Sequence, residues 1–218
     1  MSSPHQTGFG SNTSHAATVA PPRVQVNPVA NVALVASFAA FIAVAAILPA
    51  ITIGPVPITL QTFAVMLTGA VLGAGRGFLA VLLYIAIGLL GLPVFAGGVA
   101  GFAVFARPSI GYLLAFPFAA WLIGFLVARI HSTRFASRSA LIFLATIAGN
   151  VVFIWPLGIL GMWWRVPFDS FSQAFMANLV FVPGDLIKGA LAAIIAVFVH
   201  RAFPNLLVRR QVRANIEE

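Results

Sequence analysis

The chain of 218 residues is 61% hydrophobic and only 7% charged, which leaves too few polar side chains to cover the surface of a soluble globular protein. The net charge of +8 comes mainly from arginines between apolar segments and near the C-terminus, a distribution typical of membrane topology signals rather than of nucleic-acid binding. The absence of cysteine excludes disulfide bonds, thiol catalysis and cysteine-based metal sites.

The two ends of the chain differ from its middle. Residues 1–27 are rich in Ser, Thr, His, Pro and Gly and contain no apolar run, so they predict a disordered N-terminal tail. They do not resemble a signal peptide, because the apolar segment that follows is long and lacks a clear cleavage site. We expect residues 28–204 to form one membrane domain and residues 205–218 to form a basic cytoplasmic tail.

Six apolar segments follow the N-terminal tail. They lack the alternating pattern of barrel strands, so helices are predicted. The expected fold class is an all-α membrane protein with six transmembrane helices, at residues 29–48, 59–72, 78–90, 110–128, 139–160 and 184–203.

The connections between these segments are mostly uncharged. Three prolines and a glycine exclude a helix at residues 49–58, and residues 73–77 predict a tight charged turn. Residues 91–108 are glycine-rich and apolar apart from one arginine. Such backbone is tolerated at membrane depth only where protein or a water-filled cavity shelters it, so this segment predicts the wall or lid of a cavity.

The connection at residues 161–182 is longer. It carries Trp163 and Trp164, which are suited to a membrane interface, and its 170–181 portion predicts an interfacial helix.

The arginines predict the orientation. Six spans put both termini on the same side of the membrane, and with the termini inside only Arg107 and Arg165 lie outside. Arginine enrichment marks the cytoplasmic side, so both termini are predicted to be cytoplasmic. The nine inner arginines are Arg23, Arg76, Arg129, Arg134, Arg138, Arg201, Arg209, Arg210 and Arg213.

Asp185 and Lys188 stand at the start of the last apolar segment. Asp185 is one of four acidic residues, and Lys188 is the only lysine. Charged groups in such segments are usually paired and face protein or water. The first turn of a helix favours an ionised carboxylate, and Lys188 lies three residues later on the same face. The pair is therefore either a structural contact between helices or part of a polar binding site.

Further candidates for a small-molecule site are polar, aromatic or flexible residues of the outer half and of the fifth span. An aromatic residue taken alone is more often a packing residue than a ligand contact. The candidates are Gln61, Phe95, Gly97, Gly98, Arg107, Tyr112 and Asn150.

Other chemistries are disfavoured by what surrounds Asp185. The histidines all lie in tails or on the inner side, which excludes a histidine-carboxylate metal cluster or a Ser-His-Asp arrangement there. The sole lysine is followed by Gly189, so the chain lacks the Gly-Lys-Ser/Thr of an ATP-binding loop. We expect no metal and no cofactor, and the absence of inverted repeats gives little support for a self-sufficient secondary transporter.

Four segments carry a specific resemblance: GPVPITLQT at 54–62, GLLGLPVFAGG at 88–98, GYLLAFP at 111–117 and PGDLIK at 183–188. In this order they closely resemble the BioY family, the substrate-binding membrane components of energy-coupling-factor (ECF) biotin transporters, over residues 31–203. The resemblance implies a multi-pass protein of the bacterial cytoplasmic membrane that is no enzyme and captures biotin from the outer face.

The resemblance also implies partners. These are a transmembrane scaffold protein and two ATPase subunits, which fits the missing ATP-binding loop, besides the surrounding membrane lipid. Small residues on the first helix of similar proteins contact the scaffold, which would give that role to Ala36, Ala40 and Ala43. Nucleic acid is not an expected partner.

Biotin suits the candidate residues. Its ureido ring offers two N–H donors and a carbonyl acceptor, its other ring and side chain are apolar, and its carboxylate needs a cation. We expect Asp185 and Lys188 to hold its polar groups, Tyr112 and the glycine-rich loop to enclose it, and Arg107 to be a weaker candidate for the carboxylate. Alternatives are a membrane enzyme using Asp185 as general base, an ECF component for another vitamin, and a structural membrane subunit.

Overall fold

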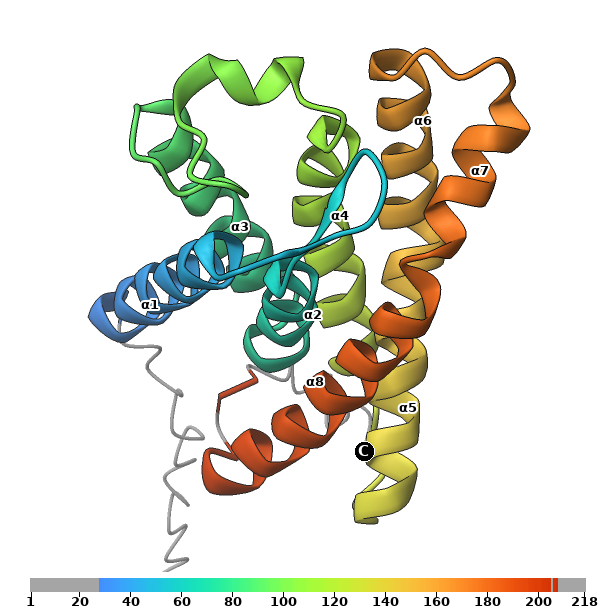
Figure 1. Cartoon of the computed structure of the whole chain (residues 1–218). Helices are drawn as coiled ribbons and strands as arrows, with labels where there is room; N and C mark the ends of the chain where they lie inside the picture. The colour runs from blue at the N-terminus through green and yellow to red at the C-terminus, as the bar shows by residue number, and fades with distance from the viewer. Residues whose placement is uncertain (1–27, 205, 208–218) are drawn as a thin grey trace, which may run out of the picture.

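The computed structural model describes residues 28–204 and 206–207. The predicted tail at 1–27 lies outside these residues, as does the predicted basic tail at 205–218 apart from Leu206 and Leu207. Figure 1 shows a helical bundle in which α5 and α6 form one long rod and α8 crosses the bundle obliquely. The mostly helical architecture predicted from the sequence is confirmed.

The described residues contain eight α-helices, a short hairpin, a 3₁₀ helix and a π-helical turn. The hairpin pairs β1 (Ile51–Thr52) with β2 (Pro57–Ile58), the 3₁₀ helix is Gly101–Ala106, and the π-helical turn is Asn150–Ile154. The α-helices are α1 (Pro28–Ile47), α2 (Gln61–Leu72), α3 (Ala74–Leu89), α4 (Ile110–Val127), α5 (Phe135–Gly149), α6 (Trp155–Arg165), α7 (Phe171–Leu179) and α8 (Val182–Ala202).

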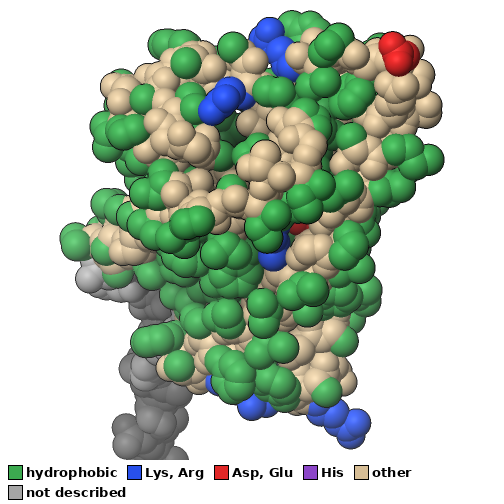
Figure 2. Space-filling model, viewed as in Figure 1, with side chains coloured by type: hydrophobic (Ala, Val, Ile, Leu, Met, Phe, Trp, Pro, Cys, Tyr) green, Lys and Arg blue, Asp and Glu red, His purple; other side chains and the backbone are tan. Residues whose placement is uncertain are grey.

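Four helical stretches in the described residues are long and apolar enough to cross a membrane: α1, α4, α8 and the continuous stretch Phe135–Arg165 of 31 residues. The apolar helices α2 and α3 are shorter, with 12 and 16 residues. Figure 2 shows hydrophobic side chains covering the middle of one face, with basic side chains towards its upper and lower ends. This surface is typical of a protein embedded in lipid.

Three predicted boundaries are wrong. The fifth span was predicted to begin at residue 139, but α5 begins at Phe135, so Arg138 lies in the helix. The turn predicted at residues 73–77 shrinks to Gly73, because its φ of 80° ends α2 and lets α3 begin at Ala74. The fifth span was predicted to end at residue 160, but the helix continues to Arg165 and carries Trp163 and Trp164. No helix-breaking sequence interrupts it there, and Pro156, which has no N–H to donate, directly follows the π-helical turn within the continuous helix.

The connections agree better with the sequence. Residues 49–58 are not helical, as predicted, and form the hairpin around Gly54, whose φ is 83°. The helix predicted within 170–181 is present as α7. Residues 91–108 lack an α-helix, although the 3₁₀ helix Gly101–Ala106 gives them more regular structure than expected.

Helix α4 lies at the centre of the bundle and packs against α2, α3, α5 and α6. It is apolar on all sides, as expected for a helix surrounded by other helices. Glycines bring its neighbours close: an added Cβ at Gly111 would lie 1.9 Å from the Leu157 carbonyl oxygen, and one at Gly69 would lie 2.5 Å from that of Ala120. These approaches place the start of α4 firmly against α6, which positions the site described next.

Candidate functional site

A pocket lies between the hairpin, the glycine-rich loop and the starts of α2, α4 and α8. Its space not occupied by atoms is about 520 Å³, including the open mouth. Its walls combine aromatic and aliphatic side chains with a few polar groups. The lining residues are Val56, Pro57, Ile58, Thr59, Gln61, Thr62, Tyr84, Phe95, Ala96, Val104, Ser109, Tyr112, Leu113, Phe116, Phe181 and Lys188.

The charge pair stands at one wall of this pocket. Lys188 Nζ lies 3.5 Å from Asp185 Oδ1, and the two residues are only 9% and 3% exposed. Lys188 lines the pocket, whereas Asp185 does not. Asp185 therefore lies behind the lysine and compensates its charge, while the remaining ammonium N–H groups stay available to the pocket.

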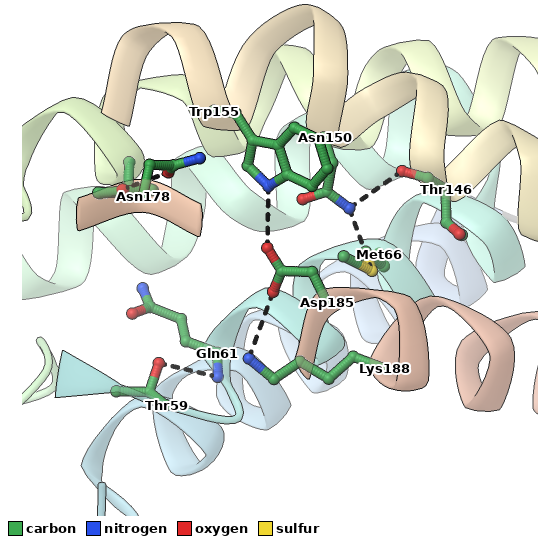
Figure 3. Close-up of polar contacts among 10 residues, drawn as sticks. Thr59, Gln61, Met66, Thr146, Asn150, Trp155, Asn178, Asp185 and Lys188 are labelled. Atoms are coloured by element: carbon green, nitrogen blue, oxygen red, sulfur yellow. Dashed lines mark hydrogen bonds and ion pairs between the residues drawn. The ribbon is translucent and has the colours of Figure 1, made fainter. Parts of the chain in front are cut away.

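A tryptophan completes the surroundings of this carboxylate. The Trp155 indole Nε1–H donates to Asp185 Oδ2 at 3.0 Å, so Lys188 and Trp155 each take one oxygen (Figure 3). Trp155 is the first residue of α6 and directly follows the π-helical turn Asn150–Ile154. Because π-helical turns rotate the following residues relative to a regular helix, this turn sets the direction of the indole.

Tyr112 and Phe181 form a second wall. The Tyr112 hydroxyl donates to Asn178 Oδ1 at 2.7 Å, which ties α4 to α7, and its ring lies 5.7 Å from the Phe181 ring. An added Cβ at Gly158 would lie 2.2 Å from the Tyr112 ring. Gly158 therefore leaves the space that this tyrosine occupies.

Gln61, Tyr84 and Phe95 form a third wall. Gln61 Nε2 donates to the Tyr84 hydroxyl at 2.9 Å, and the Tyr84 ring meets Phe95 edge to face at 5.7 Å. Gly88 makes room for Phe95, since an added Cβ would lie 2.3 Å from that ring. Thus Gln61, Phe95, Tyr112 and Lys188, four of the residues predicted from sequence, meet at one pocket.

The other predicted ligand contacts do not line this pocket. Gly97 and Gly98 have positive φ in the turn that pairs Phe95 with Val99, next to the wall residue Ala96. Arg107 is exposed at the end of the 3₁₀ helix. These residues shape or flank the loop beside the pocket.

Asn150 is fully buried away from the lining residues. Its Nδ2 donates to the Thr146 carbonyl oxygen at 3.2 Å and lies 3.8 Å from Met66 Sδ. Its Oδ1 has no hydrogen-bond partner among the described residues. A ligand contact of Asn150 stays a prediction.

The pocket thus offers one cation, neutral polar groups and apolar walls. Among the described residues, no group of three or more His, Asp or Glu side chains could hold a metal ion. The arrangement suits reversible binding of a small molecule that has both an apolar body and polar ends.

Comparison with known proteins gives the family. Residues 14–205 match the BioY family. The chain belongs to the BioY family. The "Biotin transporter BioY" of Rhizobium etli is 38% identical over 183 residues, covering 82% of this chain and 97% of the relative. That of Rhodobacter capsulatus is 38% identical over 189 residues, covering 83% and 98%.

One solved structure is also similar to this chain. The crystal structure of the S-component for biotin from an ECF-type ABC transporter matches with a TM-score of 0.72 and 32% identity, covering 79% of this chain and 92% of that one. The resemblance to the BioY family inferred from four sequence segments is therefore confirmed.

Sequence reasoning about this BioY chain missed several residues of the site, among them Tyr84, Trp155, Asn178 and Phe181. Tyr84 is one of only two tyrosines and interrupts an apolar helix, which is a usable signal because a buried hydroxyl needs a partner. Trp155 and Asn178 gave no comparable signal, since their partners come from other helices.

The predicted scaffold-contacting alanines lie on α1. Ala36 and Ala40 are exposed, Ala43 is half-buried, and Ala39 between them is buried against the bundle. The small side chains therefore leave part of α1 open to a neighbour.

The Trp155–Asp185 hydrogen bond predicts an NMR signature. In ¹⁵N-labelled protein, replacing Asp185 by Asn should move the Trp155 indole N–H resonance upfield, because the charged acceptor is lost. The resonance is assigned with Trp155→Phe, and the exposed Trp163 and Trp164 should keep their shifts. An unchanged Trp155 resonance in a folded Asp185→Asn variant would show that this carboxylate is not its acceptor.

Proposed function

We propose that this chain captures biotin at the extracytoplasmic face and is the substrate-binding component of an ECF-type transporter. The observation that carries the proposal is a pocket lined by Lys188 and apolar residues, in a chain that aligns with nearly the full length of relatives named biotin transporters. These relatives are transporters, and the chain acts as a transporter component rather than an enzyme.

The pocket suits the chemistry of biotin. The apolar ring and side chain of biotin match walls made by Phe95, Tyr112 and Phe181. The biotin carboxylate and ureido carbonyl are acceptors that an ammonium group satisfies, and Lys188 provides that group with Asp185 behind it. Gly97, Gly98 and Arg107 belong to the neighbouring loop, which we propose covers the bound ligand.

We further propose six membrane crossings with both termini cytoplasmic, in a bacterial cytoplasmic membrane. The crossings are α1, α2, α3, α4, the α5–α6 rod and α8. The arginines support this orientation, since Arg76 and Arg138 lie at the same end of the bundle. Arg76 contacts Asn31 and Leu206, and Arg138 contacts His200. In this arrangement residues 28–204 are the membrane domain, α2 crosses a part that other helices shield from lipid, and α3 keeps one side exposed.

We propose that a membrane scaffold protein and two ATPase subunits drive uptake. The similarity to the S-component for biotin from an ECF-type ABC transporter supports this proposal, and the sequence has no Gly-Lys-Ser/Thr ATP-binding loop of its own. Ala36, Ala40 and Ala43 give α1 a surface that lets another helix approach closely. Lipid covers the remaining hydrophobic surface, and nucleic acid is not a partner.

Biotin binding tests the main proposal. Protein purified from biotin-supplied cells should retain a mass equal to biotin in native mass spectrometry. Lys188→Met should weaken biotin binding about 10–100-fold, because it removes a charge-assisted interaction of about 1.5–3 kcal/mol with the ligand. Asp185→Asn should also weaken binding, because Lys188 loses the carboxylate that holds it at the pocket. Isothermal titration calorimetry measures the loss.

The matched control for these variants is Asp169→Asn, which changes an exposed acidic residue that bonds only with Gln173 in the described structure. Its affinity for biotin should equal that of the unmodified chain. Retention of a different vitamin, or full affinity in folded Asp185→Asn and Lys188→Met proteins, would contradict the proposal.

The proposed orientation can be measured directly, because the chain has no cysteine of its own. A single cysteine at exposed Ser170, before α7, should react with a membrane-impermeant maleimide on intact cells. A cysteine at exposed Thr133, between α4 and α5, should react only after the cells are opened. The reverse pattern would overturn the assignment of the termini to the cytoplasm.

The proposed scaffold contact predicts a loss of assembly. Leucine at Ala36 and Ala40 should prevent co-purification with the scaffold and the ATPases, because the larger side chains keep another helix at a distance. Biotin affinity should stay unchanged. Ala86→Leu, at an exposed alanine of α3, is the control and should still assemble. Normal assembly of the double variant would exclude this face of α1.

A further inference from the structure

A buried hydrogen-bond relay begins at Gln61 and ends on the backbone of the glycine-rich loop. The Tyr84 hydroxyl lies 2.9 Å from Gln61 Nε2 and 3.3 Å from the Val94 carbonyl oxygen. Tyr84 is 1% exposed and Gln61 is 6% exposed. The relay therefore connects α2, α3 and the loop behind the pocket wall.

The donor and acceptor of each hydrogen bond in this relay follow from the Val94 carbonyl group at its end. A backbone carbonyl can only accept, so the single hydroxyl proton of Tyr84 is directed to Val94. The Tyr84 oxygen must then accept from Gln61, and only the amide nitrogen of Gln61 can donate. This network fixes which end of the Gln61 amide is nitrogen, a choice that hydrogen-bond partners decide.

The other end of the amide is left for the pocket. Gln61 Oε1 accepts no hydrogen bond from the described residues. It is also not one of the fully buried side-chain atoms among them that lack a hydrogen-bond partner. Gln61 lines the pocket together with Lys188.

We propose that Gln61 is a specificity-determining residue that accepts a hydrogen bond from an N–H group of the ligand, and that Tyr84 positions it for this purpose. The inference rests on the proposed function, in which the ligand is biotin and the N–H belongs to its ureido ring. Lys188 then presents a donor and Gln61 an acceptor to the same ligand.

The relay makes this acceptor selective. A free glutamine can rotate its amide and offer a donor or an acceptor, but rotation here would break the bond to Tyr84 and leave a buried hydroxyl lone pair facing an oxygen. A ligand without the N–H leaves Oε1 buried without a partner. Sites of this kind reject such analogues more strongly than apolar pockets reject a missing methylene.

The test compares biotin with two carbamate analogues, in each of which one ureido N–H is replaced by a ring oxygen. Calorimetry on the unmodified chain should show at least about tenfold weaker binding for one of the two analogues. Gln61→Met, similar in length but without an acceptor oxygen, should bind biotin about tenfold more weakly. It should no longer distinguish biotin from that analogue, because the two changes remove the same hydrogen bond.

Tyr84→Phe provides a second variant. It keeps Gln61 but removes the hydroxyl to which the Gln61 amide nitrogen donates, so the amide can rotate. It should bind biotin and reduce the discrimination between biotin and the carbamate. If the unmodified chain binds biotin and both analogues equally, or if Gln61→Met keeps the full discrimination, the inference is overturned and biotin capture stands. If the unmodified chain binds none of the three compounds, the proposed function itself fails.

Discussion

The buried pair of Asp185 and Lys188 is the interaction on which the rest of the site depends. A single ammonium group inside an apolar bundle is unfavourable unless an anion compensates it, and removal of one partner of such a pair is strongly destabilising. Asp185 supplies the anion at 3.5 Å, and the Trp155 indole takes its second oxygen. The position of Lys188 at the pocket therefore requires α6 and α8 to stay in register.

The helices around this pair approach one another closely at glycines rather than through large core residues. Gly111 lets the start of α4 approach the α6 backbone, and Gly158 gives space to Tyr112. A Cβ added at Gly189 would lie only 2.7 Å from the Thr146 hydroxyl oxygen. Close contacts between small residues are the usual means by which helices associate in lipid, where the hydrophobic effect between helices is absent. The same contacts that hold the bundle together thus set the walls of the pocket.

Much of this arrangement could be predicted from the sequence, because apolar runs and rare charges carry a strong local signal. The helices and the pair at Asp185 and Lys188 belong to this class. The partners of the pair and of Tyr112 could not be predicted, since Trp155 and Asn178 come from distant segments and their alignment depends on helix rotation. The α5–α6 rod was predicted as one span at residues 139–160, but its ends at Phe135 and Arg165 and the π-helical turn within it were not, because no local sequence signal marks them.

Three polar groups of the pocket share one feature: each is held from behind by a buried partner that already uses part of its hydrogen-bonding capacity. Asp185 takes one N–H of Lys188, Tyr84 takes the amide nitrogen of Gln61, and Asn178 takes the hydroxyl proton of Tyr112. What remains toward the pocket is a donor at Lys188 and acceptors at Gln61 and Tyr112. Because these roles are set before a ligand enters, little reorganisation is needed on binding, which favours both affinity and discrimination.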